Sequence, residues 1–567
     1  MCRYQILPLL ALTFTLGAAP ARLCQAQWQV DGTPICTASG SQYFPNIVSD
    51  GAGGAIVTWT DLRNGGPYDL YIYAQRVDAA GVPQWTADGV AICTAPQGDQ
   101  PFPTITSDGA GGAIVAWQDY RNSVTHAIYA QRVSAAGVPQ WPTDGVAICT
   151  YTSVVPTIVS DDAGGAIVAW ADYRSGGSGN IYAQRVSAAG APQWTANGVA
   201  MCTAGRVFVI SDPPKIVSDG AGGAIVTWAD YRNGPIDIYA QRVNADGAVQ
   251  WTADGVALST AGGGQSYPTI VSDGAEGAIV TWEDFRSATN YDIYAQRVSA
   301  DGAPQWTPDG VALCAAANDQ TYPTITSDGA GGAIVTWSDA RSAPYAQRVS
   351  AAGAPQWTAD GVVLSTAPNP QTAPTIVSDG AGGAIVTWST TLNHSSDHTH
   401  AQRVSAAGAL QWTADGVALS TAAGGQYFPT IVSDGGGGAI VTWQDGRSGN
   451  NDIYAQRVLG SGGVLAVPPP AAAARFQLFA PFPNPTRDGQ MTIRFNLPSS
   501  ERVSAEVLDV AGHWVRTLAA SREFSPGPQV LGWDGKNDAG VGLPTGVYFV
   551  EVREGTHSEA RRAILLH

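Results

Sequence analysis

Short apolar runs separated by glycine, aspartate, asparagine and proline recur along most of the chain. The clearest run is Ala-Ile-Val-Thr-Trp, which follows Ser-Asp-Gly-x-Gly-Gly and first ends at Trp59. Further copies end at Trp117, Trp170, Trp228, Trp282, Trp337, Trp388 and Trp443, so that eight copies lie 51 to 58 residues apart. A period of this size predicts a solenoid, a propeller or another repeat array.

Each repeat shows four short segments with strand character. In the copy that contains Trp228, the second strand ends at this tryptophan, the third covers Asp237–Val243 and the fourth covers Gln250–Leu258. The first strand of the next copy covers Pro268–Ser272. Turn-forming residues separate these segments, and no helical periodicity is present. Four short strands per repeat indicate the blade of a β-propeller.

The two ends of the repeat region complement each other. Residues 27–36 have the pattern of a fourth strand without the first three, and the last copy stops after its third strand, Asp452–Val458. Pairing these segments completes eight blades and closes a ring without exposed sheet edges. We therefore predict an all-β, eight-bladed propeller over residues 27–458, with an open array or another blade count as alternatives.

Composition supports a β fold and limits the partners. Charged residues make up 13% of the chain, while 67 glycines, 36 prolines and 18 tryptophans favour turns and a packed core. The formal net charge is −17, and Lys215 and Lys536 are the two lysines. Because no basic run exists that would neutralise phosphates, nucleic acid and anionic membrane surfaces are not expected partners.

The first residues have the features of a secretory signal. Residues 1–26 combine Arg3, an apolar stretch over 6–19 and a small-residue cleavage site at Cys24-Gln25-Ala26. No later stretch reaches the roughly 18 apolar residues that a membrane span requires. We expect a mature protein that is secreted or held at the outer-membrane surface.

Most of the repeated polar residues have structural explanations. Asp50 precedes glycine, where its carboxylate is expected to accept turn N–H groups. Asp61 and Arg63 recur after the tryptophan, and the arginine of Gln-Arg-Val, first Arg76, is expected to pair with acids of the Asp61 type. A group present in every blade is interpreted as scaffold, because a catalytic group is needed only once.

The cysteines also follow the repeat. One position of the motif Gly-Val-Ala-x-Cys holds Cys36, Cys93, Cys149, Cys202 and Cys314. Equivalent positions in successive repeats lie farther apart than the roughly 7 Å Cα limit for a disulfide. We interpret these residues as half-buried thiols, and predict neither a disulfide framework nor a metal cluster.

The stretch from Ser49 to Trp59 is loosely similar to the Asp-box of sialidase-like propellers, although its Gly-to-Trp spacing is longer. The Asp-box is a fold feature, so the resemblance implies no sialidase activity. The Tyr-Ala-Gln-Arg-Val…Trp…Asp-Gly-Val pattern also resembles repeats of uncharacterised secreted bacterial proteins.

The repeats give way to a linker over residues 459–475 and a different domain over residues 476–567. Alternating apolar residues predict about seven strands, as in an Ig-like sandwich. The blocks Phe482-Pro-Asn-Pro485, Asp509-Val-Ala-Gly512, Trp533-Asp-Gly535 and Gly546-Val-Tyr-Phe549 resemble the C-terminal sorting domain of type IX secretion cargo and, equally, the FlgD-type Ig-like domain. The resemblance implies that residues 476–567 engage a secretion machinery; the final His567 departs from the usual basic end.

The best local cluster of metal-ligating residues is in the seventh repeat, at His394, Asp397, His398 and His400. Imidazole and carboxylate groups suit zinc or copper. The alternative is that His400 replaces the tyrosine of the third strand while His394 and His398 belong to a loop. Calcium is a further candidate at Asn290 with Asp292 and at Asn450 with Asp452, although turn formation also explains these pairs. No other cofactor is expected.

No nucleophile elbow, phosphate loop or distinctive pair of carboxylates emerges, and no catalytic or cofactor-binding residue is predicted. The first hypothesis is therefore a non-enzymatic surface protein that binds a glycan, protein or cell-envelope ligand. Residues 392–400 and Val207–Pro214, which interrupt the repeat, would carry its specificity. The alternatives are an exported polysaccharide hydrolase or lyase, with non-repeated acids, histidines or tyrosines at one channel mouth, and a structural surface-layer component.

Overall fold

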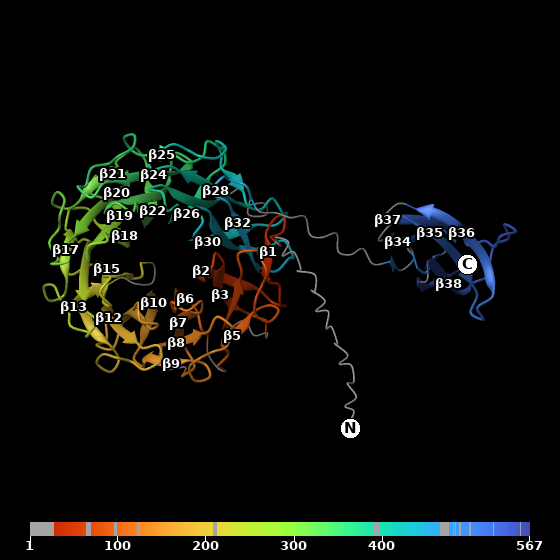
Figure 1. Cartoon of the computed structure of the whole chain (residues 1–567), viewed down its shortest axis with the longest axis horizontal. Coiled ribbons are helices and arrows are strands. Elements are labelled where there is room, and N and C mark those ends of the chain that lie inside the picture. Colours follow the sequence, from red (N-terminus) through yellow and green to blue (C-terminus); the bar gives the residue numbers. More distant parts are fainter. Residues whose placement is uncertain are drawn as a thin grey trace, which may run out of the picture. The chain divides into compact units, whose positions relative to one another are not determined.

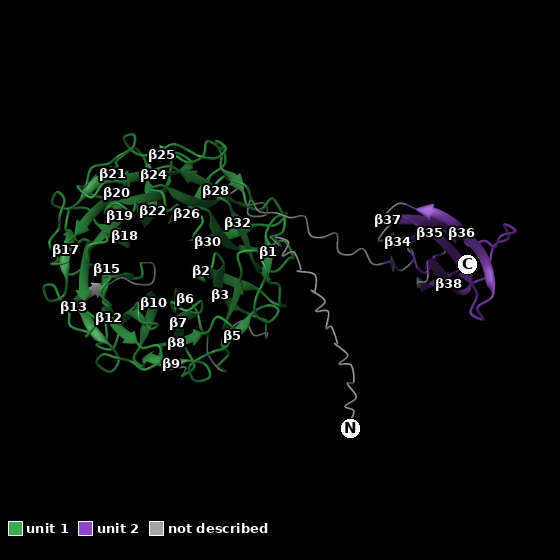
Figure 2. Cartoon of the chain, in the orientation of Figure 1, with its two compact units in different colours: residues 1–467 green, residues 468–567 purple. Residues whose placement is uncertain are grey.

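The computed structural model describes residues 28–566 apart from 64–69, 96–98, 123–124, 178, 208–211, 391–396, 465–475, 480, 482–483, 487–488, 498–499, 525–526 and 556. The chain forms two compact units, Met1–Val467 and Pro468–His567, which are coloured separately in Figure 2. The predicted signal segment and most of the predicted linker lie outside the described residues. Within the described part, no helix has the length and apolar character needed to cross a membrane.

The first unit is a ring of eight antiparallel, four-stranded blades (Figure 1). The innermost strands, which surround the axis, are β2 (Gln42–Ser49), β6 (Thr104–Ser107), β10 (Ser153–Ser160), β14 (Lys215–Ser218), β18 (Gln265–Ser272), β22 (Gln320–Ser327), β26 (Gln371–Ser378) and β30 (Gln426–Ser433). The second strands are β3 (Ala55–Asp61), β7 (Ala113–Asp119), β11 (Ala166–Asp172), β15 (Ala224–Asp230), β19 (Ala278–Asp284), β23 (Ala333–Asp339), β27 (Ala384–Thr390) and β31 (Ala439–Asp445). These second strands are buried along almost their whole length, because both faces pack against neighbouring blades.

Two further strands complete each blade toward the outside of the ring. The third strands are β4 (Tyr71–Val77), β8 (Ala127–Val133), β12 (Gly179–Val186), β16 (Asp237–Val243), β20 (Asp292–Val298), β24 (Ala343–Val349), β28 (His398–Val404) and β32 (Asp452–Val458). The fourth strands are β5 (Val90–Cys93), β9 (Val146–Cys149), β13 (Val199–Val207), β17 (Val256–Ser259), β21 (Val311–Cys314), β25 (Val362–Val363), β29 (Val417–Ala418) and β1 (Thr33–Cys36).

The ring closes as the two ends of the repeat region predict. Strand β1 pairs antiparallel with β32, with Thr33 opposite Ala455, and so completes the eighth blade. Trp28 is fully buried, and its Nε1–H donates to the Ala79 carbonyl at 3.1 Å. Trp85 makes the equivalent bond to Ala135 at 3.0 Å in the next blade, so Trp28 occupies the place of a fourth-strand tryptophan. The prediction of eight blades is confirmed.

The predicted fourth strand Gln250–Leu258 is too long. Strand β17 begins only at Val256, because Asp254 has a φ of 63° and Gly255 a φ of 89°, which interrupt extended backbone. The Asp254 carboxylate accepts the Thr203 N–H at 2.7 Å from the preceding blade. The turn therefore links neighbouring blades.

The Ser-Asp-Gly turn holds its aspartate as predicted, but the arginine pairing differs from the prediction. Asp50 Oδ1 accepts the N–H groups of Ala52 and Gly54, each at 2.8 Å. Arg76 pairs with this same Asp50 at 2.9 Å and not with acids of the Asp61 type. Its guanidinium also donates to the Ala135 carbonyl of the next blade at 3.2 Å, so the turn is tied across the blade boundary.

The Asp61-type acids serve a second repeated cluster. Asp61 accepts the Trp59 indole N–H at 2.7 Å and pairs with Arg63 at 2.7 Å. The Arg63 guanidinium lies 3.6 Å over the Tyr73 ring, a cation–π contact. Cys36 lies beside it, with the Arg63 Nη2 at 3.3 Å from the sulfur. The described cysteines are free and buried, more deeply than predicted, and burial raises the pKa of the Cys36 thiol to about 12.

The second unit consists of two antiparallel sheets. One contains β33 (Gln477–Leu478), β34 (Met491–Leu497) and β37 (Gly527–Trp533), and the other contains β35 (Glu501–Leu508), β36 (Trp514–Phe524), β38 (Gly546–Glu554) and β39 (His557–Leu565). Phe495 and Trp533 from the first sheet share one buried core with Val507, Tyr548 and Val550 from the second. This is the predicted Ig-like sandwich, with Asp509–Gly512 turning between β35 and β36.

Replacing Trp28 by alanine tests the closure of the ring. Because the side chain is fully buried between the first and last blades, Trp28→Ala is expected to cost about 3–5 kcal/mol of stability. Thermal unfolding followed by circular dichroism measures the change. Val30→Ala, at a position that is 51% exposed, is the control and should unfold as the wild type does. Equal melting temperatures for both variants would contradict the closure.

Candidate functional site

The innermost strands place a ring of aromatic side chains around the axis of the propeller. Each of these side chains directly precedes a proline, and for Phe44 the register shift between Tyr43 and Asn46 marks a β-bulge. Four members are 47–56% exposed: Phe44, Phe102, Tyr322 and Phe428. Tyr267 belongs to the same set, and its ring lies 5.3 Å from that of Tyr322. Exposed aromatic faces at the centre of the ring are available to a ligand.

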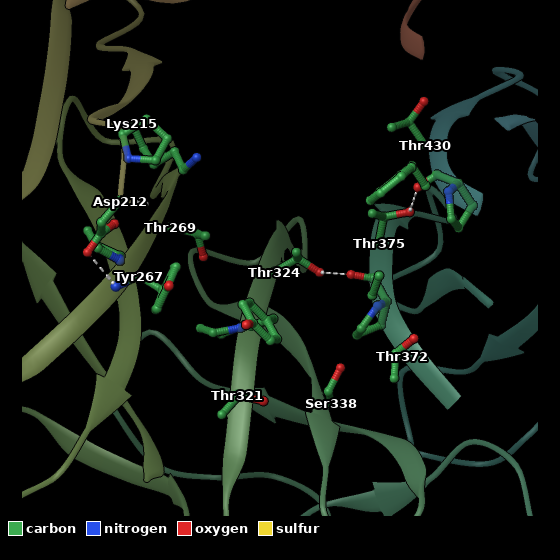
Figure 3. A pocket seen from close by; sticks show the side chains of 18 residues that line it. Asp212, Lys215, Tyr267, Thr269, Thr321, Thr324, Ser338, Thr372, Thr375 and Thr430 are labelled. Atoms are coloured by element: carbon green, nitrogen blue, oxygen red, sulfur yellow. Dashed lines mark hydrogen bonds between the residues drawn. The ribbon is translucent and has the colours of Figure 1, made fainter. Parts of the chain in front are cut away.

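A second ring, of polar residues, follows the prolines. Its members are Asn46, Thr104, Thr157, Lys215, Thr269, Thr324, Thr375 and Thr430. Several donate to a proline carbonyl of the next blade: Thr324 to Pro374 at 3.2 Å, and Thr375 to Pro429 at 3.3 Å (Figure 3). Lys215 is the member that departs from this set, because it replaces a hydroxyl or amide with an ammonium group.

These two rings line the cavity at the axis. A volume of about 620 Å³ is bounded by the inner strands from Asp212 to Thr430, and a smaller one of about 250 Å³ by those from Phe44 to Lys215. Proline, threonine and aromatic side chains make up most of the described lining. Its charged members are Asp212 and Lys215, and Lys215 borders both volumes. The larger volume is of the size that binds a small ligand or part of a polymer.

Asp212 lies where the repeat is interrupted. In the fifth blade Glu283, between Trp282 and Asp284, accepts the Tyr322 N–H of the next blade at 2.6 Å. In the fourth blade this position is Ala229, which has no acceptor group, and Asp212 instead accepts the Tyr267 N–H at 2.8 Å (Figure 3). Asp212, a carboxyl group outside the repeat, therefore accepts the backbone hydrogen bond that the residue after the tryptophan accepts in the fifth blade. Asp212 also lines the cavity.

The environment of Asp212 favours its protonated form. The residue is 5% exposed, and its Oδ1 has no hydrogen-bond partner among the described residues. Burial raises the pKa of the Asp212 carboxyl to about 6, against the opposing effects of the Tyr267 N–H and the Lys215 ammonium. Burial also raises the pKa of Glu283 to about 7, and the Asp212 charge adds to that rise. Lys215 has its pKa lowered by desolvation.

The histidine cluster predicted from the sequence is only partly described. His394 lies outside the described residues, Asp397 is buried, and His398 Nδ1 is 3.1 Å from Gln426 Oε1. His400 stacks on Trp388 with ring centroids 6.2 Å apart, so it takes the place of the repeated tyrosine. Burial and the neighbouring His398 lower the pKa of His400 to about 4. Among the residues that the structure describes, no three metal-ligating side chains are grouped for an ion.

The residues suggested for calcium have other roles where they are described. The Asn290 amide donates to Asp292 at 2.7 Å and to the Asn318 carbonyl at 3.0 Å, which organises a turn. In the eighth blade, the Asn450 N–H approaches Ser448 Oγ at 3.3 Å. Calcium binding at either pair stays a prediction.

Sequence reasoning located one part of this site and missed the other. The segment Val207–Pro214 contains Asp212, but no single residue within it was predicted as functional, because Asp212 belongs to no motif. Composition identifies Lys215 only as one of the two lysines in the chain. Alignment of the eight copies provides the signal for it, since seven copies have threonine or asparagine at that position.

One family model matches part of the second unit. Residues 484–558 match the model of the FlgD Ig-like domain. No curated protein matches the chain. Similar solved structures include a protein of unknown function from Dyadobacter fermentans, with 10% identity, a TM-score of 0.39 and coverage of 76% of this chain and 98% of that one. A polysaccharide lyase of the ulvan lyase type has 9% identity, a TM-score of 0.39 and coverage of 77% and 96%.

A third similar structure is PorZ of Porphyromonas gingivalis, described as a surface component of the type IX secretion system. It has 10% identity, a TM-score of 0.22 and coverage of 95% of this chain and 100% of PorZ. These names describe the proteins compared, and likenesses at such identities carry no activity over to this chain.

The prediction that the protein is not an enzyme is nevertheless wrong as it stands. Several of the similar structures are carbohydrate-active enzymes, the ulvan lyase among them. The prediction assumed that a repeated frame leaves no distinctive catalytic group. The described lining of the cavity contains two charged groups, Asp212 and Lys215, that belong neither to the repeat nor to a motif.

Asp212→Asn is expected to raise the melting temperature at pH 7.5 and to leave it nearly unchanged at pH 4. Because the folded-state pKa of about 6 lies above the ordinary aspartate value, the ionised carboxylate costs stability above that pH. This cost disappears as the pH falls toward 4, and it amounts to at most about 3 kcal/mol. Thermal unfolding at both pH values measures it. Asp246→Asn, at an exposed site, is the matched control, and equal behaviour of the two variants would contradict the assignment.

Proposed function

We propose that the protein is an exported polysaccharide hydrolase or lyase whose active site is the cavity at the axis of the propeller. The observation that carries the proposal is Asp212, a buried carboxyl group with an unpartnered oxygen in the wall of that cavity. It matches the arrangement expected of an enzyme, in which non-repeated groups meet at the channel. Non-enzymatic binding of a glycan would need the aromatic ring but not a carboxyl group of this kind.

The lining suits a chain of sugars. Aromatic faces such as Tyr322 and Phe428 offer flat apolar surfaces for sugar rings, and the threonines between them offer hydroxyl groups to sugar hydroxyls. The cavity is ringed by inner strands and lined by many equivalent groups, an arrangement that accommodates a repeating polymer.

Asp212 would act as the general acid. In hydrolysis the bond from the anomeric carbon to the leaving oxygen breaks and water adds to that carbon, whereas in β-elimination the bond from C4 to the leaving oxygen breaks as C5 loses its proton and a C=C bond forms. In both reactions the leaving oxygen gains a proton. A carboxyl group with a pKa of about 6 retains its proton near neutral pH to a far greater extent than an ordinary aspartate. The Tyr267 N–H orients the group by binding Oδ2, and the buried Oδ1, which has no hydrogen-bond partner among the described residues, is the oxygen that would carry the proton. Glu283 holds the Tyr322 backbone and is a positioning residue.

Loss of the acid should abolish turnover while the fold survives. Asp212→Asn keeps an acceptor for the Tyr267 N–H but cannot donate the proton, so kcat is expected to fall by about 100-fold or more. Release of new sugar ends from a panel of polysaccharides measures the rate. In the wild type the rate should decline as the pH rises above about 6, since the acid loses its proton.

Asp246→Asn, which removes an exposed carboxylate, should retain the wild-type rate. Turnover that persists in Asp212→Asn, or that no polysaccharide elicits in the wild type, would reject the proposal.

A second proposal concerns residues 476–567. We infer that this unit directs export, through a secretion machinery, to the cell exterior or its surface. The match to the FlgD Ig-like domain over residues 484–558 supports the proposal, together with the sequence blocks shared with type IX sorting domains.

Deleting residues 476–567 is expected to hold the protein in the periplasm, because the remaining propeller has its own core and closure. Cell fractionation followed by immunoblotting locates the truncated chain. The full-length chain with Trp514→Ala, an exposed position, controls for changes in expression. Unchanged delivery of the truncated chain would overturn the sorting role.

A further inference from the structure

Lys215 is a cation placed in a ring that otherwise has none. Seven blades have threonine or asparagine at this position, and the hydroxyl or amide of Asn46, Thr324, Thr375 and Thr430 donates to a neighbouring proline carbonyl. The Lys215 ammonium has no hydrogen-bond or ion-pair partner among the described residues. Figure 3 shows its side chain reaching into the open space of the cavity. The substitution therefore weakens the scaffold at one point and leaves an unpaired charge there.

Asp212 is the other charged group in the described lining, and it interacts electrostatically with Lys215. Its raised pKa keeps part of its population neutral at mildly acidic pH, so it offsets the Lys215 charge only in part. The net charge of −17 does not contradict a local positive site. Repeated acids such as Asp50 are paired with arginines, and charges farther than about 8 Å are largely screened at physiological ionic strength.

Desolvation lowers the pKa of Lys215, and a bound anion favours its charged form. A half-buried ammonium binds an anion more strongly than it would in open water, because the local dielectric constant is lower. The position of Lys215 at the junction of both cavity volumes places such an anion on the axis. Asp212, three residues earlier in the same segment, lines the same volume. A negatively charged sugar bound at Lys215 would therefore lie beside the group that donates the proton.

We propose that the substrate is an anionic polysaccharide and that the Lys215 ammonium binds the carboxylate or sulfate of a sugar next to the cleaved bond. The inference rests on the proposed function, since it names the substrate class of the same cavity. Carboxylate and sulfate share the chemistry that Lys215 recognises, so binding to either supports it.

Isothermal titration calorimetry with the full chain tests the inference. The probes are polygalacturonate for the carboxylate, dextran sulfate for the sulfate and dextran as the uncharged reference. Lys215→Thr restores the residue of the neighbouring blades and so preserves the fold, as its melting temperature should show. Lys536→Thr, in the second unit, removes the same charge from a residue that is not among the described lining of the cavity.

The wild type and Lys536→Thr should bind at least one polyanion more tightly than dextran. Lys215→Thr should lose about tenfold or more of that affinity, and the loss should shrink at high salt. Equal polyanion affinity of Lys215→Thr and the wild type, or equal binding of dextran and polyanions by the wild type, would overturn the inference.

Turnover measured with the same proteins and probes distinguishes the proposed enzymatic function from the proposed anionic substrate. Lys215-dependent binding of a polyanion without its cleavage would reject the enzyme but keep the anionic ligand. Cleavage of an uncharged glycan that depends on Asp212 would keep the enzyme and reject the anionic substrate.

Discussion

The ring depends on one charged contact that is repeated at every blade boundary. The arginine of the third strand pairs with the aspartate of its own Ser-Asp-Gly turn and donates to a carbonyl of the next blade, as Arg76 does with Asp50 and Ala135. The guanidinium of the last such arginine, Arg457, donates to the Ala79 carbonyl of the first blade at 2.9 Å, so these contacts continue around the whole ring. A buried carboxylate without its arginine is costly, which is why the pair is kept in each copy.

These contacts between blades determine which positions can carry functional residues. Positions engaged in the blade-to-blade contacts cannot vary without weakening the ring. The aromatic and polar side chains of the inner strands contribute less to the contacts between blades. The fourth blade departs from the repeat among these side chains. There Ala229 removes the acceptor that a neighbouring backbone N–H needs, and Asp212 replaces it from the cavity side at 2.8 Å. The same segment exchanges a threonine for Lys215. One interruption thus introduces an acid and a cation into a lining whose other described residues are uncharged.

Most of the fold follows from periodicity, because eight similar copies bury the same residues in the same way. The spacing of the tryptophans and the partial repeats at Trp28 and Asp452–Val458 were sufficient to predict closure. Pairing of Arg76 with Asp50, and not with Asp61, has one signal in the sequence, because the seventh copy has Thr390 in place of the Asp61-type acid and still has the arginine, Arg403. The candidate site could not be predicted from the sequence for a different reason. Its members are brought together by the ring, while the sequence separates Asp212 from Phe428 by four blades and marks neither with a motif.

The central claim is that function resides on the axis, where the fourth blade departs from the repeat. A crystal structure of the Asp212→Asn variant with a bound oligogalacturonide tests it most directly. We expect sugar rings against Tyr267, Tyr322 or Phe428, an acid group within hydrogen-bonding distance of the Lys215 ammonium, and a glycosidic oxygen facing residue 212. Binding of the oligosaccharide to the outer strands or the loops of the rim, with the axis unoccupied, would contradict it.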